Sequence, residues 1–171
     1  MSDGTIWIQS TRAPDGDPAC QADWGPLRWY APVEDVRQTA TDLVTCAAYA
    51  EIMMTMVLRV GVPPEMASQF MTDLLADADR HFFGADTTLS LLPAGSSKRR
   101  EALVLVQRGS RKGALSPDEA RAMALRWFSV AEATESDQLI SEALRSTGVD
   151  DETQEKVCGY LRALRAEDVT P

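Results

Sequence analysis

Residues 46–61, CAAYAEIMMTMVLRVG, form the most apolar stretch of the chain and raise the question of whether it crosses a membrane. From Cys46 to Leu58 only Glu51 and Thr55 are clearly polar. The run is well short of the roughly 20 apolar residues that span a bilayer, and it contains a carboxylate. We therefore interpret it as part of a buried helix and not as a membrane anchor.

The apolar stretch continues a longer helical pattern that begins upstream. Glu34 and Asp35 follow Pro32, as is typical of a first helical turn, where carboxylates complement the helix dipole. Apolar side chains then recur at three- and four-residue spacing at Val33, Val36, Ala40, Leu43, Ala47, Ala50, Met54 and Val57. Gly61 and the prolines at 63–64 end the pattern. The sequence therefore predicts a long helix over 33–59 that runs from the surface into the core.

A second helix is predicted over 64–83, and it carries part of a methionine cluster. Five methionines lie close together at Met53, Met54, Met56, Met66 and Met71. Methionine-rich faces can serve as adaptable binding surfaces, but methionine also fills irregular space between packed helices. We favour the core role, because the second helix has one apolar stripe of Met66, Phe70, Met71, Leu74, Leu75, Ala78 and Phe82.

The rest of the chain alternates between strand and helix patterns. Short apolar runs bounded by turn residues predict strands at 5–10, 87–92 and 102–108, which we expect to form one small sheet. A helix stays an alternative for 98–107. The motif SPDE at 116–119 is a capping box that predicts the start of a helix, and further helices are predicted near 137–147 and 151–166.

These elements predict an α+β fold that is predominantly helical, with about five helices packed around the long central helix 33–59. We expect residues 1–31 to form an irregular N-terminal strap with one short strand, and residues 32–171 to form a single mainly helical domain. The strap contains large aromatic side chains, which are rare in flexible linkers. We expect them to lie in grooves of the helical body, or alternatively to form an aromatic interface of Trp7, Trp24, Trp29 and Tyr30. No internal repeat is evident.

No motif predicts a catalytic residue, a metal ligand or a cofactor. The chain has one histidine, His81, and the nearby Asp77 and Asp79 would spread with it over about 200° of a helix without converging. The three cysteines are odd in number and form no CxxC pair, which argues against a disulfide framework and a zinc site and favours the cytoplasm. Acidic residues that converge in an unrecognised catalytic site are the weakest alternative.

The charge pattern has one basic exception in an acidic chain. Seventeen basic and 26 acidic residues give a net charge of −9, which repels phosphate backbones overall. Between 98 and 112, however, a single acid accompanies six basic residues: Lys98, Arg99, Arg100, Arg108, Arg111 and Lys112. If 103–107 is a strand, they lie at its two ends, and the second group leads toward the helix at Ser116, an arrangement that can bind an anion. The alternatives are a solvated loop and a contact with the acidic surface of a second copy.

The leading functional hypothesis is a soluble, non-enzymatic protein–protein interaction or assembly protein that acts in the cytoplasm. Its partner would be another protein or a second copy of the chain, and we expect no membrane contact. Binding of an anion or nucleic acid through residues 98–112 is the alternative.

Overall fold

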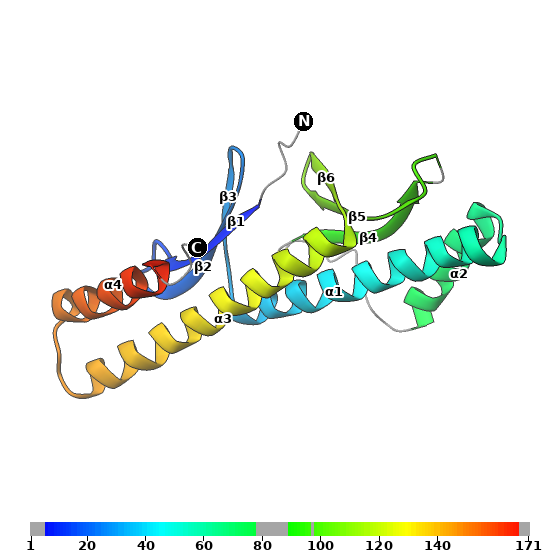
Figure 1. The fold of residues 1–171 in the computed structure, drawn as a ribbon. Coiled ribbons are helices and arrows are strands. Elements are labelled where there is room, and N and C mark those ends of the chain that lie inside the picture. Colours follow the sequence, from blue (N-terminus) through cyan, green and yellow to red (C-terminus); the bar gives the residue numbers. More distant parts are fainter. Residues whose placement is uncertain (1–5, 78–88, 97, 168–171) are drawn as a thin grey trace.

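The computed structural model describes residues 6–77, 89–96 and 98–167, which form two three-stranded antiparallel sheets and four α-helices (Figure 1). The first sheet contains β1 (Trp7–Arg12), β2 (Pro18–Trp24) and β3 (Leu27–Ala31). It is followed by α1 (Val33–Thr55), a π-helical turn (Met56–Val60) and α2 (Pro64–Asp77). The second sheet contains β4 (Ser90–Ser96), β5 (Glu101–Arg108) and β6 (Arg111–Leu115), and α3 (Pro117–Ser146) and α4 (Asp151–Glu167) follow it.

The predicted number of helices is wrong, because the expected break between 131 and 137 does not occur. In the described residues α3 runs without interruption from Pro117 to Ser146. The polar side chains inside it have partners: the Thr134 hydroxyl donates to the Val130 carbonyl at 2.9 Å, and the Asp137 carboxylate accepts from Arg165 at 2.7 Å. A buried polar group with a hydrogen-bond partner does not interrupt a helix. The start of α3 is as predicted, with Ser116 and Glu119 forming the reciprocal capping box.

The predicted single sheet of 5–10, 87–92 and 102–108 is also wrong. The N-terminal strand β1 pairs with β2, while β4 pairs with β5 in a separate sheet. Residues 18–24 and 27–31, which lie in the predicted strap, form β2 and β3. A tight turn with Gly25 at φ +59° joins these two strands, and such short connections favour local pairing over pairing with a distant strand.

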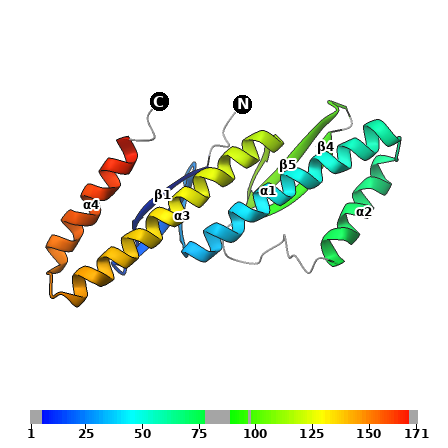
Figure 2. The ribbon, with the colours of Figure 1, turned by 60° about the horizontal axis from the view of Figure 1, so that its bottom comes forward.

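The expected single central helix is replaced by two long helices, α1 and α3, that pack antiparallel beside each other. Both sheets lie on one face of this helix pair, and α2 and α4 lie at its opposite ends (Figures 1 and 2). The sheets are exchanged between the halves: α3 packs mainly on β1 and β2, and α1 packs mainly on β4 and β5. Each sheet is therefore covered mainly by the long helix of the other half and only to a smaller extent by the helix that follows it in the chain.

The chain contains a structural repeat that was not evident in the sequence. Each half consists of three antiparallel strands followed by two helices. Arg37 is the fifth residue of α1 and Arg121 the fifth of α3, while Glu51 and Glu135 are the nineteenth residues of the same helices. Arg37 pairs with Glu135, and Arg121 pairs with Glu51. These reciprocal ion pairs place a pseudo-two-fold axis between α1 and α3.

The long apolar helix predicted over 33–59 is present as α1 with its π-helical turn. By length and composition this is the one helix in the described ranges that could cross a membrane, although core helices of soluble proteins pass the same test. Up to Met54 one face of the helix is covered, with Val36, Leu43 and Ala47 fully buried, while Val44 and Ile52 on the other face are 41% and 46% exposed. Beyond Met54 burial decreases: Met56 and Val57 are half-buried, and Leu58 and Val60 are 37% and 71% exposed. The burial of the first part favours the core interpretation, but the predicted direction is wrong, because the helix begins in the core and its C-terminal end is exposed.

Candidate interaction surfaces

The six predicted basic residues do not form one patch, because strand β5 separates them into two groups. Lys98, Arg99 and Arg100 occupy the turn between β4 and β5 and are all exposed. Arg108, Arg111 and Lys112 lie at the other end of β5, roughly 25 Å away at about 3.3 Å per residue.

Two members of the second group contact the first sheet. The guanidinium of Arg108 lies over the Trp29 ring, 4.3 Å from its centroid, and burial lowers its pKa. Arg111 donates from Nη1 to the Trp24 carbonyl at 3.0 Å and lies against Gly25, where a Cβ would approach Nη1 to 2.2 Å. These arginines therefore join the two sheets, and Lys112 is the exposed member of the group.

The helix N-terminus that follows this basic group already has an anionic partner of its own. The Glu119 carboxylate accepts the backbone N–H of Ser116 at 2.7 Å, which lowers the pKa of Glu119. Asp118 adds a second exposed carboxylate in the same turn. A bound phosphate would have to approach these two negative groups, so the α3 N-terminus is a poor anion site.

The predicted aromatic residues divide into a buried and an exposed pair. Trp24 and Trp29 are 1% and 7% exposed and belong to the main hydrophobic core. Trp24 fills the space above Gly113, where a Cβ would lie 3.2 Å from its ring. Trp7 and Tyr30 are 67% and 41% exposed, and they lie on the face of the first sheet that is turned away from the helices. Of the four predicted aromatic residues, Trp7 and Tyr30 are therefore the two that a partner could reach.

A larger apolar surface lies on the hairpin formed by α1 and α2. We define the hairpin surface as Ile52, Met56, Met66, Phe70 and Leu74. The exposed fractions are 46% for Ile52, 64% for Met66, 50% for Phe70 and 37% for Leu74, and Met56 is half-buried. A fully exposed side chain of this size presents roughly 200 Å², so the surface offers about 400 Å² of apolar area.

The hairpin surface is continuous across the two helices. A surface depression of about 330 Å³ is lined by Ala48, Glu51, Ile52, Thr55 and Met56 of the α1 segment. Met56 also packs against the small cluster of Met53, Ala67 and Met71 that joins α2 to α1. Met53 of α1 and Met71 of α2 lie in the contact between the two helices, and Ile52 and Phe70 each come one position before them. In two antiparallel right-handed helices, residues one position before the contact point to the same side of the pair. Leu74, one turn after Phe70, lies on this side as well. This side faces away from the second sheet.

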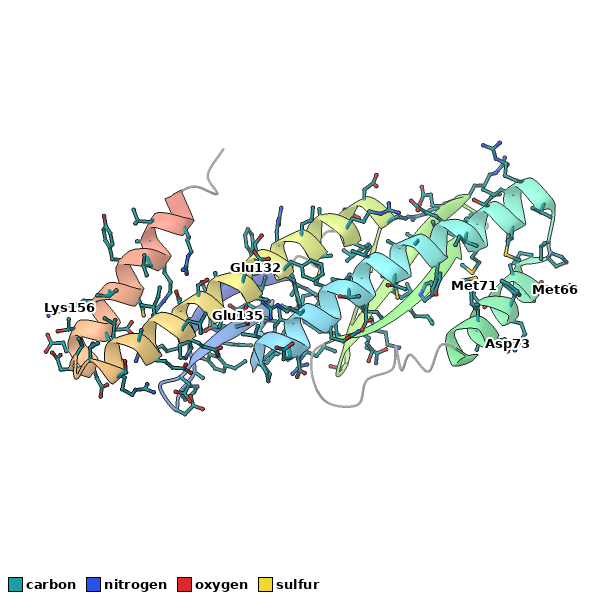
Figure 3. All side chains as sticks on the ribbon, turned by 90° about the horizontal axis from the view of Figure 1, so that it is seen from below. Met66, Met71, Asp73, Glu132, Glu135 and Lys156 are labelled. Atoms are coloured by element: carbon teal, nitrogen blue, oxygen red, sulfur yellow. The ribbon has the colours of Figure 1, made fainter. Side chains whose placement is uncertain are left out.

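Acidic groups border this surface on its outer edge. Asp73 lies on the edge of α2 away from α1, whereas Met71 lies between the two helices (Figure 3). The Asp73 carboxylate accepts a hydrogen bond from the Gln69 side chain at 2.7 Å. Glu65 is exposed in the first turn of α2. Glu132 is exposed on the same helical face of the molecule, but it lies on α3 beside the first part of α1 and does not border this surface (Figure 3).

The corresponding helix of the second half is attached differently. Asp137 of α3 is 1% exposed and contacts Arg165 of α4 at 2.7 Å, Ser10 of β1 at 3.1 Å and Arg162 at 3.5 Å. Glu155 of α4 also lies 2.6 Å from Arg12 of β1. An ionic network thus fixes α4, whereas apolar contacts around Met53 and Met71 fix α2.

The described residues contain no group of three or more histidine, cysteine, aspartate or glutamate side chains placed to hold a metal ion. His81 and Asp79 lie outside the described residues. The cysteines are free and buried, and burial raises the pKa of Cys20 and, still more, of Cys46. Such thiols stay protonated at neutral pH and are poor nucleophiles.

The hairpin surface was missed in the sequence because its residues were assigned to a single buried stripe. In the structure that stripe divides: Ala67 and Met71 face α1, and Met66, Phe70 and Leu74 face solvent. Leu75 has no described side chain, and Ala78 and Phe82 lie outside the described residues. The signal was the width of the stripe, about 180° of α2, which exceeds what one neighbouring helix can cover.

No protein-family model matches this chain, and no match was found among curated proteins or solved structures.

Proposed function

We propose that the protein is a non-enzymatic protein–protein interaction module and that the hairpin surface is its binding site. The observation that carries the proposal is the concentration of exposed large apolar side chains. Of fourteen such residues in the described ranges, Ile52, Leu58, Val60, Met66, Phe70 and Leu74 fall in the segment 52–74. Patches of several hundred Å² on soluble proteins are often functional, because an uncovered apolar area of this size favours association.

Other features agree with this role. The hairpin surface has methionines beneath and within it, and their flexible side chains adapt to a partner's shape. The apolar area of about 400 Å² would form the centre of an interface of ordinary size, roughly 800 Å² per partner with a polar rim. The free, buried cysteines fit the reducing cytoplasm that we propose as its compartment.

The proposal is tested by site-specific photo-cross-linking in the producing cell. A photoreactive residue at position 70 should give a discrete cross-linked protein band, while the same residue at position 139 should not. Leu139 is a matched control because it is 63% exposed on α3, toward the other end of the helix pair. The proposal fails if the two positions give the same products or if neither reacts with protein.

A second candidate function is anion binding by the turn between β4 and β5. Lys98, Arg99 and Arg100 are consecutive and exposed, and none of them forms an ion pair with another described residue. Titration with single-stranded DNA and with inorganic phosphate at low salt tests this function. Replacement of the three residues by alanine should abolish binding, whereas Lys112→Ala should have little effect. An unchanged signal in the triple variant would exclude this site.

A further inference from the structure

We infer that the hairpin surface binds an amphipathic helix of a partner protein that carries lysine or arginine along its flanks. The inference rests on the proposed function, which it extends from an interaction module to a class of partner. It follows from the shape of the surface, from the charges around it and from the way in which α2 is attached.

The shape fits a helix better than an extended strand. Met66, Phe70 and Leu74 lie at successive four-residue steps and form one straight ridge along α2. Ile52 and Met56 form a parallel ridge on α1, with the depression of about 330 Å³ on the far side of this ridge from α2. Two parallel apolar ridges receive a third helix through side chains at its i, i+4 and i+7 positions.

The charges around this surface select a basic partner. Asp73 and Glu65 are exposed on α2, and Asp73 lies on the outer edge of this helix (Figure 3). Arg121 is already paired with Glu51, and Arg59 of the π-helical turn lines a separate depression with Met54 and Ala102 on the side of α1 turned toward the second sheet. The exposed basic residues 98–100 lie on the turn of the second sheet, on the other side of the helix pair.

The net charge of −9 adds a long-range attraction for a basic segment. A second copy is a poorer occupant for the same reason. In a two-fold dimer through this surface, each copy would bring its own Asp73 and Glu65 to the contact. The apolar centres would match, but the rims would carry the same negative charge on both sides, which opposes association. A partner with cationic flanks has the complementary rim.

The attachment of α2 permits adjustment to a bound helix. Its equivalent α4 is held by directional ion pairs, including Asp137 with Arg165 and Arg12 with Glu155. The contact of α2 with α1 depends on Met53, Ala67 and Met71, with the half-buried Met56 beside them. Methionine contacts change geometry at low cost, whereas buried ion pairs hold one arrangement. The same position in the two halves is thus rigid in one and adaptable in the other.

The test is selection from a displayed library of helical peptides with randomised surface charge. The full chain is the target, and the Phe70→Ser variant serves for counter-selection. We expect enriched peptides with helical apolar spacing and a net positive charge, and Phe70→Ser should weaken the binding of a synthesised winner about tenfold or more. Met66→Ser should weaken it in the same direction, while Leu139→Ser should leave it unchanged. Circular dichroism of each variant separates loss of binding from loss of fold.

Charge is tested separately with Asp73→Asn. This variant should bind the cationic peptide about threefold more weakly and should bind a version with neutral flanks as the wild type does. Enrichment of acidic or extended peptides, or equal enrichment on the Phe70→Ser variant, would overturn the inference. A dimer in light scattering that Phe70→Ser dissociates would assign the surface to a second copy instead. Cross-linking from position 70 to a partner segment without basic flanks would retain the proposed function and reject this extension.

Discussion

Replacement of Asp137 by alanine should detach α4 from the body of the protein. The Asp137 side chain is 1% exposed and holds Arg165 at 2.7 Å and Arg162 at 3.5 Å. Removal of one member of a buried ion pair costs about 3–5 kcal/mol, because the remaining charges lose their partner. The side chains of Arg162 and Arg165 are 24% and 35% exposed, so water compensates part of this loss. We therefore expect a destabilisation of about 3 kcal/mol, at the lower end of that range.

Cys158 reports on the detachment, because it lies beneath α4 with 1% exposure and its Sγ is 3.4 Å from the Ser141 hydroxyl. If labelling requires local opening of α4, a loss of about 3 kcal/mol should accelerate native-state labelling of Cys158 roughly a hundredfold. Mass spectrometry distinguishes Cys158 from Cys20 and Cys46, whose labelling should change much less. Glu132→Ala, which removes an exposed carboxylate from the same helix, is the control. A labelling rate within threefold of the wild type, together with an unchanged urea midpoint, would refute the structural role of Asp137.

Three further predictions concern the core, the pH dependence and the thiols. Trp127 is 0% exposed, so Trp127→Ala should lower the free energy of unfolding by about 3–5 kcal/mol in urea titrations, and a change below about 1 kcal/mol would contradict its place in the core. The hydrogen bond from Arg121 lowers the pKa of Glu51 relative to an unfolded glutamate. The stability that this pair contributes is therefore complete above the unfolded pKa of about 4.3 and is lost as the pH falls through the folded pKa, so Arg121→Gln should flatten the decrease of the urea midpoint on acidification. Burial raises the pKa of Cys20 and Cys46, so both should react with a thiol reagent far more slowly in the native protein than in urea. Equal rates would contradict the burial of these two thiols.

Helices were easier to predict from this sequence than the way in which they pack. The pattern over 33–59 and the capping box at Ser116 depend on local spacing, which the sequence displays directly. The continuity of α3 depends on distant partners. Asp137 can be buried in a helix because Arg165 reaches it from α4, and Cys20 of β2 lies 3.2 Å from the Thr134 hydroxyl. No local pattern indicates such long-range contacts, so a break was predicted where the chain is merely polar.

The repeat is weak in the sequence because many of its equivalent buried positions carry different residue types. Ala40 and Ala124 occupy equivalent buried positions, but Leu43 corresponds to Trp127 and the buried Met71 corresponds to Cys158. The similar segments GVPPE at 61–65 and GVDDE at 148–152 are a part of the repeat that the sequence does show. Gly61 and Gly148 have φ values of +78° and +79°, so each ends its long helix in the left-handed conformation that favours glycine.

The candidate site was only partly accessible to the same reasoning. The basic residues were identified, and their separation by a strand followed from the pattern of 103–107. The use of Arg108 and Arg111 against Trp29 and Trp24 could not be foreseen, because the first sheet itself was not predicted. For α2, an apolar stripe shows only that one face of the helix favours contact with another apolar surface. Whether a neighbour in the same chain covers it depends on the tertiary arrangement, and here α1 covers half.

The exchange of sheets between the halves indicates where the protein can vary without losing its fold. Each long helix covers the sheet of the other half, so neither half can bury its core alone and a change in α1 affects β4 and β5. Helices α2 and α4 lie outside this shared core, each packed mainly on one long helix. The pseudo-two-fold axis therefore constrains α1 and α3 to remain alike in packing, as their reciprocal ion pairs show, but it imposes no such constraint on α2 and α4. The two terminal helices differ in the way expected if one serves stability and the other binding: Asp137 and Arg165 close one end with charge, and Met66, Phe70 and Leu74 leave the other apolar and exposed.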